Sequence, residues 1–488
     1  MLTSAFDRNA MLWLCLYLPE LPLEVFTRGS QDTSPLVVHC GSAGRPRVVA
    51  ANLSARSAGI KSGLALAAAR ALQTDLRVHP RDQAAERRAL EALAAWSGQF
   101  TSMVSLVRPN ALVLEVAGSL RFFGGLNPLL EKLRTAIDRL GYQAQLATAP
   151  TPLAATLLAR QGEGICISGH GQLVRALSEL PLTVLDLEED KQIRLNGMGL
   201  HRLGDVLCLP REGLARRFGT ELLSLLDRAL GGLPDPRMPF VAPPRFAGHL
   251  LLPAEVENTE ALLFGLQRLV RELVGLLRAR VAGVRVMTLQ LVHGPASLTD
   301  VRVGMVTPGR DEKYLLELLK VRLERVRLTA PVREIRLLTD AIESHRASCQ
   351  DLFPGLAAEA EAEGMLVERL RARLGEDAVR GISPVADHRP ELAWRWSEPG
   401  QGGGQLSGTQ RPLWLLSTPM ALTTYQGRPC LEQVLTLWPE QERIESGWWD
   451  GQDIRRDYFI AEDRQGMRYW IFRELSECGG WFLHGLFG

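Results

Sequence analysis

Cysteine and histidine are scarce in this chain, and neither is arranged as a metal site. The 488 residues include seven cysteines and nine histidines. They form no C-x-x-C pair and no H-E-x-x-H motif, the spacings typical of structural and catalytic zinc sites. An odd number of scattered cysteines is typical of a reducing compartment. We therefore expect a cytoplasmic protein that needs no structural zinc, and we predict no cofactor.

Long apolar runs and a strong charge bias are also missing. No apolar run reaches the roughly 18 residues of a membrane span, so we expect no membrane association. The formal net charge of +1 excludes a basic tail, although it allows a local basic surface. Hydrophobic residues make up 46% of the chain, as in ordinary globular proteins. Because 488 residues are too many for one core, we expect three or more domains.

Strands interrupted by helices predict an α+β domain over residues 11–175. A short apolar run over 11–18 ends at Pro19 and is typical of a buried strand. Residues 36–51 contain two β-branched runs around a Gly- and Pro-containing turn, which predicts a hairpin. Helices are expected at 83–96, 126–140 and 152–160.

Residues 176–240 are expected to form a further domain, and the pattern from Leu180 to Gly232 is fully helical. Within them, Leu195–Val206 resembles a helix-hairpin-helix, with Gly197 and Gly199 between two short helices. Glycines at such a turn let backbone N–H groups approach a DNA phosphate. The alternative is an α-hairpin in which glycine only caps a helix. The residues alone leave both interpretations open.

Residues 245–342 predict one compact module with the order strand, helix, strand, strand, helix, strand. This module is rich in arginine and lysine, which favours contact with phosphates. The alternative is that many of these side chains are solvated parts of helix faces. The candidate DNA-binding residues are Arg268, Arg271, Arg285, Arg302, Lys320, Arg322 and Arg336.

The region 343–410 is predicted to be a linker. Ala357–Gly364 is of low complexity, a short helix is expected at Met365–Leu374, and Ser397–Gln405 is typical of a flexible connection. Residues 411–488 then alternate apolar and polar residues, which predicts a small β-rich module. Its tryptophans form either the core of that module or a partner surface.

Three segments resemble motifs of Y-family (translesion) DNA polymerases. Ala55-Arg56 followed by Gly59–Gly63 is similar to the family's finger motif, in which a tyrosine and an arginine contact the incoming triphosphate. Arg56 remains as a candidate for residual nucleotide contact, whereas Leu53 stands at the tyrosine position. Gly118–Gly124 is similar to the family's Gly-Ser-x-x-Leu-Phe-Gly segment.

The third segment lacks the lysines of the family motif. Ala147–Thr156 parallels the family's Gly-Ile-Ala-x-Asn-Lys-x-x-Ala-Lys segment, with Pro152 and Thr156 at the lysine positions. Order and content of these segments over about residues 11–340 resemble the ImuB branch, the inactive polymerase homologues of bacterial SOS mutagenesis cassettes. The resemblance implies a palm with fingers (11–175), a thumb (176–240), a little finger (245–342), a clamp-binding linker (343–410) and a β-rich partner-binding module (411–488).

The metal-binding carboxylates of the family are missing. Leu16 and Leu18 stand where an Asp-x-Asp pair is expected, and Asn110 and Ala111 replace an Asp-Glu pair. Nucleotidyl transfer needs two divalent cations, and Mg²⁺ is held by carboxylate oxygens. Glu115 is one carboxylate where several are needed. We therefore predict that the chain is not a polymerase.

The resemblance also implies partners. ImuB-type proteins are adaptors that bind the sliding clamp, the alpha subunit of an error-prone polymerase of the replicative type, and a RecA-like ImuA protein. Clamp-binding peptides resemble Gln-Leu-(Ser/Asp)-Leu-Phe, and Gln350, Asp351, Leu352 and Phe353 match this pattern with the glutamine shifted by one place. The alternative is an ordinary helix-to-loop transition.

Three hypotheses follow. The first is a non-catalytic adaptor in error-prone translesion synthesis that binds damaged primer-template DNA in the cytoplasm, at the nucleoid. The second is an active Y-family polymerase with an atypical metal site that uses Glu20, Glu24 and Glu115. The third is a scaffold that keeps the fold but no longer binds DNA.

Overall fold

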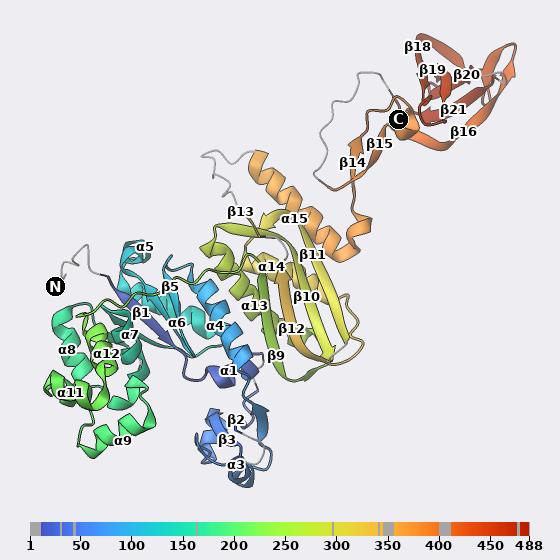
Figure 1. Ribbon diagram of the computed structural model, residues 1–488. Coiled ribbons are helices and arrows are strands. Elements are labelled where there is room, and N and C mark those ends of the chain that lie inside the picture. Colours follow the sequence, from blue (N-terminus) through green and yellow to red (C-terminus); the bar gives the residue numbers. More distant parts are fainter. Residues whose placement is uncertain are drawn as a thin grey trace. The chain divides into compact units, whose positions relative to one another are not determined.

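The computed structural model forms two compact units, Met1–Ala362 and Glu363–Gly488 (Figure 1). Within these units, none of the described helices combines the length and apolar character needed to cross a membrane. The residues that the structure describes are 11–29, 32–41, 45–162, 164–294, 297–339, 342–344, 356–399, 411–475 and 479–487.

The first unit contains a five-stranded sheet with the order β5-β6-β1-β7-β8. This sheet and the helices that cover it are called the body. The middle strand β1 is antiparallel to both of its neighbours. Its residues alternate between two hydrophobic clusters, with Leu14 and Leu16 in one and Trp13 and Cys15 in the other. Both faces of the sheet are therefore covered, which explains the uninterrupted apolar run. The strands are β1 (Trp13–Tyr17), β5 (Val104–Val107), β6 (Ala111–Glu115), β7 (Gln145–Ala149) and β8 (Ile165–Cys166).

Helices cover the two faces of this sheet. Residues of α1 (Leu21–Thr27), α4 (Gln83–Ser97) and α6 (Leu126–Leu140) pack in the cluster that contains Leu16. The predicted helix 126–140 is confirmed, and Gly141 ends it in the left-handed conformation. The short elements η1 (Ala117–Ser119) and α5 (Leu120–Phe123) precede it. The other face is covered by α7 (Pro152–Gln161).

A small lobe is inserted between α1 and α4 (Figure 1). Its three-stranded sheet has the order β3-β2-β4, and β2 and β3 form the predicted antiparallel hairpin. The two short helices after the hairpin are separated by Gly59 and Gly63, which both have φ of +87°. The lobe contains β2 (Leu36–Cys40), β3 (Arg47–Ala51), α2 (Leu53–Ser57), α3 (Leu66–Leu72) and β4 (Arg77–Pro80).

A helical segment follows the body and packs against the face of the sheet that carries Trp13 and Cys15. The helical pattern predicted from the sequence is confirmed here. The elements are α8 (His170–Ser178), η2 (Leu182–Leu185), α9 (Glu189–Gly197), α10 (Leu203–Leu207), α11 (Arg211–Phe218) and α12 (Thr220–Leu230).

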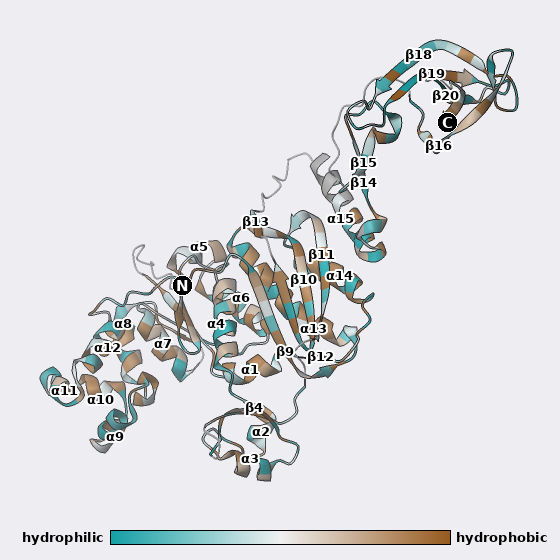
Figure 2. Cartoon of the chain, turned by 45° about the vertical axis from the view of Figure 1, so that its right-hand side comes forward, coloured by the Kyte–Doolittle hydropathy of each residue, from teal (hydrophilic) through white to brown (hydrophobic). Residues whose placement is uncertain are grey.

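The basic module (residues 246–344) has the predicted strand and helix order. Its sheet runs β11-β10-β12-β9, and the short β13 pairs with β10. Hydrophobic and hydrophilic residues alternate along these strands (Figure 2), so one face packs on α13 and α14. The elements are β9 (Phe246–Val256), α13 (Thr259–Ala279), β10 (Ala282–Gly294), β11 (Ser297–Gly309), α14 (Glu312–Leu323), β12 (Val332–Thr339) and β13 (Ile342–Ser344).

The helix expected at Met365–Leu374 is longer than predicted. It begins at Leu356 as α15 (Leu356–Leu374), because the alanines and glutamates of the low-complexity stretch are strong helix formers. Between it and the last sheet lies a two-stranded sheet of β14 (Gly381–Pro384) and β15 (Trp394–Ser397), flanked by η3 (Glu376–Ala378) and η4 (Pro390–Leu392). The low-complexity composition did not predict these elements.

The predicted β-rich module is a six-stranded antiparallel sheet with the order β17-β16-β21-β20-β19-β18. Arg389, which is buried, donates hydrogen bonds to Asp387 and to Asp450 in the turn between β18 and β19. This contact joins the η4 region to the larger sheet. The strands are β16 (Trp414–Tyr425), β17 (Arg428–Cys430), β18 (Thr436–Ser446), β19 (Ile454–Glu462), β20 (Arg468–Glu474) and β21 (Trp481–Leu486).

Filled carboxylate positions and a candidate nucleic-acid interface

Buried hydrophobic side chains occupy most of the positions that were expected to hold metal-binding carboxylates. Leu16 and Leu18 are 0% exposed and belong to the main hydrophobic cluster, and Ala111 is buried on the opposite face. The Asn110 side-chain amide donates to the carbonyl of Leu18 at 3.1 Å, and the Leu18 amide donates to the Asn110 carbonyl at 2.9 Å. These positions are therefore occupied by packed side chains and paired backbone.

The remaining carboxylates of this region serve other purposes. Glu115 accepts hydrogen bonds from the amides of Leu12 and Ala117. Glu24 is buried and accepts from the Gln143 amide at 2.6 Å. Burial raises the pKa of Glu24 to about 8, against the lowering effect of that hydrogen bond. Among the described residues, no group of three or more histidine, cysteine, aspartate or glutamate side chains could hold a metal ion.

Arg56, the candidate for residual nucleotide contact, is engaged within the chain. Its guanidinium lies 2.8 Å from the Glu20 carboxylate. Leu53, at the position of the family tyrosine, is 80% exposed, and the Thr156 hydroxyl donates to the carbonyl of Pro152 rather than facing a ligand. Glu20 therefore neutralises the cation predicted to contact nucleotide.

The helix-hairpin-helix candidate has an uncrowded turn, but its backbone amides already donate hydrogen bonds within the chain. A Cβ added at Gly197 or Gly199 would meet no atom within 4 Å, and Gly199 has φ of +77°. The amides of Met198, Gly199 and Leu200 donate to carbonyls of α9, and those of His201 and Arg202 donate to the Asp205 carboxylate. A phosphate at this turn would have to share these donors or contact neighbouring side chains.

Two of the candidate DNA-binding residues of the basic module lie against the body. Arg268 and Arg271 lie on α13 and are half-buried. Arg268 stacks on Phe264 at 4.4 Å, and burial, together with Arg28 and Arg271, lowers its pKa to about 10. Arg271 pairs with Glu312 at 2.8 Å and donates to the carbonyl of Arg139 in α6. Both arginines thus pack the module against the body.

Three other candidates face outward. Arg302 lies opposite Thr288, and Arg336 lies opposite Gln290, on the face of the sheet away from the helices. Arg336 is paired with Glu334. Arg302 and Lys320 are exposed and have no acidic partner within the part of the chain that the structure describes.

Two further candidates on the module lie elsewhere on its surface. Arg285 is exposed and pairs with Glu343 at 2.8 Å, and Arg322 lies in the last turn of α14. The predicted clamp-binding residues Gln350, Asp351, Leu352 and Phe353 lie outside the described residues.

Comparisons with known proteins decide the family. The model of the impB/mucB/samB family matches residues 27–160. Protein ImuB of Caulobacter vibrioides is 31% identical over 473 residues, which cover 88% of this chain and 100% of that protein. The chain belongs to the ImuB family. This membership confirms the resemblance predicted from the sequence, and with it a Y-family polymerase-like α+β fold that carries an additional β-rich C-terminal region.

More distant relatives of this ImuB-family chain are polymerases. DNA polymerase IV of Marinomonas sp. is 23% identical over 201 residues, 40% of this chain and 57% of that protein. Among solved structures, an insertion ternary complex of Dbh DNA polymerase is 18% identical with a TM-score of 0.40, covering 68% of this chain and 99% of that one. DinB from Sulfolobus solfataricus matches with the same coverage and a TM-score of 0.39.

Proposed function

We propose that this protein is a non-catalytic adaptor in error-prone translesion DNA synthesis. The observation that carries the proposal is the filled metal site. Leu16 and Leu18 are core residues, and Glu24 and Glu115 are held by backbone amides. A two-metal mechanism needs several carboxylates around one open position. The alternative of an active polymerase with Glu20, Glu24 and Glu115 as ligands loses its support.

The proposed adaptor keeps the polymerase-like architecture as a DNA-holding frame. Residues 11–175 take the place of palm and fingers, 176–240 of the thumb and 245–342 of the little finger. Arg302 and Lys320 are the best candidates for phosphate contact because no carboxylate among the described residues neutralises them. Binding of this kind is sequence-independent and weakens steeply with salt.

The proposed tethers follow the DNA-holding frame in the chain. The peptide 350–353 docks in a pocket of the sliding clamp, and the module 411–488 binds the error-prone replicative-type polymerase and a RecA-like ImuA partner. Linking several modest contacts raises the effective concentration of each partner, so no single contact has to be strong. The protein would act in the cytoplasm, at the nucleoid.

Clamp binding tests the tether. We expect the Leu352→Ala, Phe353→Ala double variant to lose about tenfold or more in clamp affinity, because it removes the apolar anchors of the peptide. The matched control is Met365→Ala, Leu366→Ala, which removes two exposed apolar side chains of α15. Equal clamp affinity of the wild type and the motif variant would place the docking site elsewhere.

A further inference from the structure

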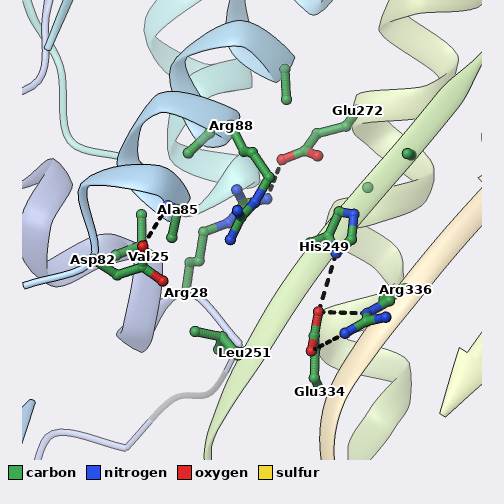
Figure 3. A pocket seen from close by; sticks show the side chains of 14 residues that line it. Val25, Arg28, Asp82, Ala85, Arg88, His249, Leu251, Glu272, Glu334 and Arg336 are labelled. Carbon is green, nitrogen blue, oxygen red and sulfur yellow. Dashed lines mark hydrogen bonds and ion pairs between the residues drawn. The ribbon is translucent and has the colours of Figure 1, made fainter. Parts of the chain in front are cut away.

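A buried ion pair joins the body to the basic module. Arg28 follows α1, Tyr142 follows α6, and Glu272 lies in the middle of α13. These residues are 5%, 1% and 2% exposed. Arg28 donates hydrogen bonds to the Tyr142 hydroxyl and to the Glu272 carboxylate, and its guanidinium lies 4.3 Å from the centre of the Tyr142 ring. Figure 3 shows Arg28 and Glu272 meeting beside β9.

Around this ion pair the body and the basic module pack so closely that two glycines, Gly275 and Gly29, have no room for a side chain. A Cβ added to Gly275 of α13 would lie 2.0 Å from the Trp96 ring of α4. A Cβ added to Gly29 would lie 2.4 Å from the carbonyl oxygen of Leu251 in β9. Any side chain at either position would force the surfaces apart. The contact therefore has the fit of a protein interior.

The packing of α13 agrees with this conclusion. Its buried residues include Leu269, Leu273 and Leu276 and also Glu272 and Gly275, so more than one stripe of the helix is covered. A helix that packs only on its own sheet buries a single stripe. The additional cover comes from α4 and α6 of the body, which both contact α13. Separation of the module would expose this apolar surface and two charges.

We infer that the contact between Arg28 and Glu272 is a lock that holds the basic module in one position on the body, both before and after DNA binding. The inference rests on the proposed function for its consequence: the exposed Arg302 and Lys320 are held in fixed positions before DNA binds, so ordering of the module does not reduce the affinity for DNA. Arg268 and Arg271 then belong to the lock rather than to the DNA contact.

An engineered disulfide tests whether the lock is closed. A Cβ at Gly98 would lie 3.1 Å from the Cβ of Ala279, slightly closer than the roughly 3.8 Å usual in disulfides. The variant Gly98→Cys, Ala279→Cys would carry a site-specific protease sequence between Pro243 and Pro244. After oxidation and cleavage, we expect the two fragments to run as one species without reductant. Either single cysteine variant, treated in the same way, should give two fragments.

The same protein tests whether the lock stays closed on DNA. We expect oxidised and reduced protein to bind a labelled primer-template within about twofold of each other. Absence of the cross-link, or a tenfold or larger loss of affinity on oxidation, would overturn the inference. Cross-linking is measured without DNA. If the protein cross-links but binds no DNA in either state, the inference of a closed lock therefore stands and the proposed DNA-binding function is refuted.

Two unlocking variants and a matched control complete the test. Gly275→Leu places a side chain against Trp96, and Glu272→Lys places a second cation beside Arg28. The control Gly213→Leu makes the same change as Gly275→Leu at a helical position where no atom lies within 4 Å. With the protease site present, we expect the cleaved wild type and control to elute as one complex and both unlocking variants to separate.

DNA affinity of the uncleaved proteins should fall about tenfold in both unlocking variants, although neither changes Arg302 or Lys320. Circular dichroism and resistance of the separated fragments to a second protease show that each part is still folded. Intact complexes and unchanged affinity in both variants would overturn the inference.

Discussion

Removing either partner of the Arg28–Glu272 pair should be costly, and the loss on removing Glu272 should depend on pH. Both groups are at least 95% buried. Removing one member of such a pair leaves an uncompensated buried charge and costs about 3–5 kcal/mol, whereas replacing both by apolar residues of similar size is often close to neutral. We therefore compare Arg28→Met, Glu272→Leu and the double variant.

Glu24 sets the pH dependence of Glu272→Leu. The unpaired Arg28 can use Glu24 as its counter-ion, because the two groups interact and Glu24 has a pKa of about 8 in the intact protein. Ionising Glu24 costs about 1.4 kcal/mol for each pH unit below that value. The loss in Glu272→Leu should therefore shrink by about 1–2 kcal/mol as the pH rises from about 6 to 9.

Arg28→Met leaves the Glu272 carboxylate buried without the guanidinium that donates to it. The loss in this variant should also be about 3–5 kcal/mol, because a buried charge has lost its partner.

Urea unfolding followed by circular dichroism, repeated at several pH values, gives the three differences in free energy of unfolding. The double variant should lose less than either single variant. Three equal losses, or a loss in Glu272→Leu that does not shrink as the pH rises, would refute the assignment of Arg28 and Glu272 as a buried pair.

Three further predictions concern neighbouring sites. Glu24→Gln should be as stable as the wild type at about pH 5 and more stable than it at pH 9, because a raised carboxyl pKa removes stability as pH rises from about 4.5 through 8. Thermal unfolding of both proteins at both pH values checks this. A difference in stability that is the same at both pH values would contradict it. Arg302→Gln and Lys320→Gln should each weaken primer-template binding and reduce the slope of log affinity against log salt by about 1, whereas Arg271→Gln should leave the slope unchanged. Glu20→Gln frees Arg56 from its ion pair but supplies no lysine or metal ligand, so nucleotide titration should still detect no binding; saturable binding by the variant would show a residual triphosphate site.

The sequence predicted most elements of the fold because their signals are local. The helix 126–140 has an amphipathic pattern and a glycine immediately after it, and the module 245–342 has two-residue and four-residue periodicities in the right order. The length of α15 was missed because a run of alanine and glutamate was treated as low complexity, although both residues favour helices. The Arg389 contact to Asp450 was missed because it joins residues distant in sequence.

The site could be predicted only in part, because its contacts join residues that are distant in sequence. The resemblance predicts that carboxylates are missing at Leu16, Asn110 and Ala111, but it could not predict that backbone amides bind Glu24 and Glu115. Arg268 and Arg271 were grouped with Arg302 because charge is visible in sequence and burial is not. One signal could have helped: Glu272 stands within the apolar run of α13, at a position where an acid has to be paired.

Primer extension by the purified full chain tests the central claim most directly. A labelled primer-template is held at low salt with enough protein to bind most of it, and nucleotides are added with Mg²⁺ or with Mn²⁺. We predict a shifted complex and no added nucleotide with either metal. Metal-dependent extension that co-purifies with this chain and disappears in a Glu20→Gln, Glu24→Gln variant would contradict the account.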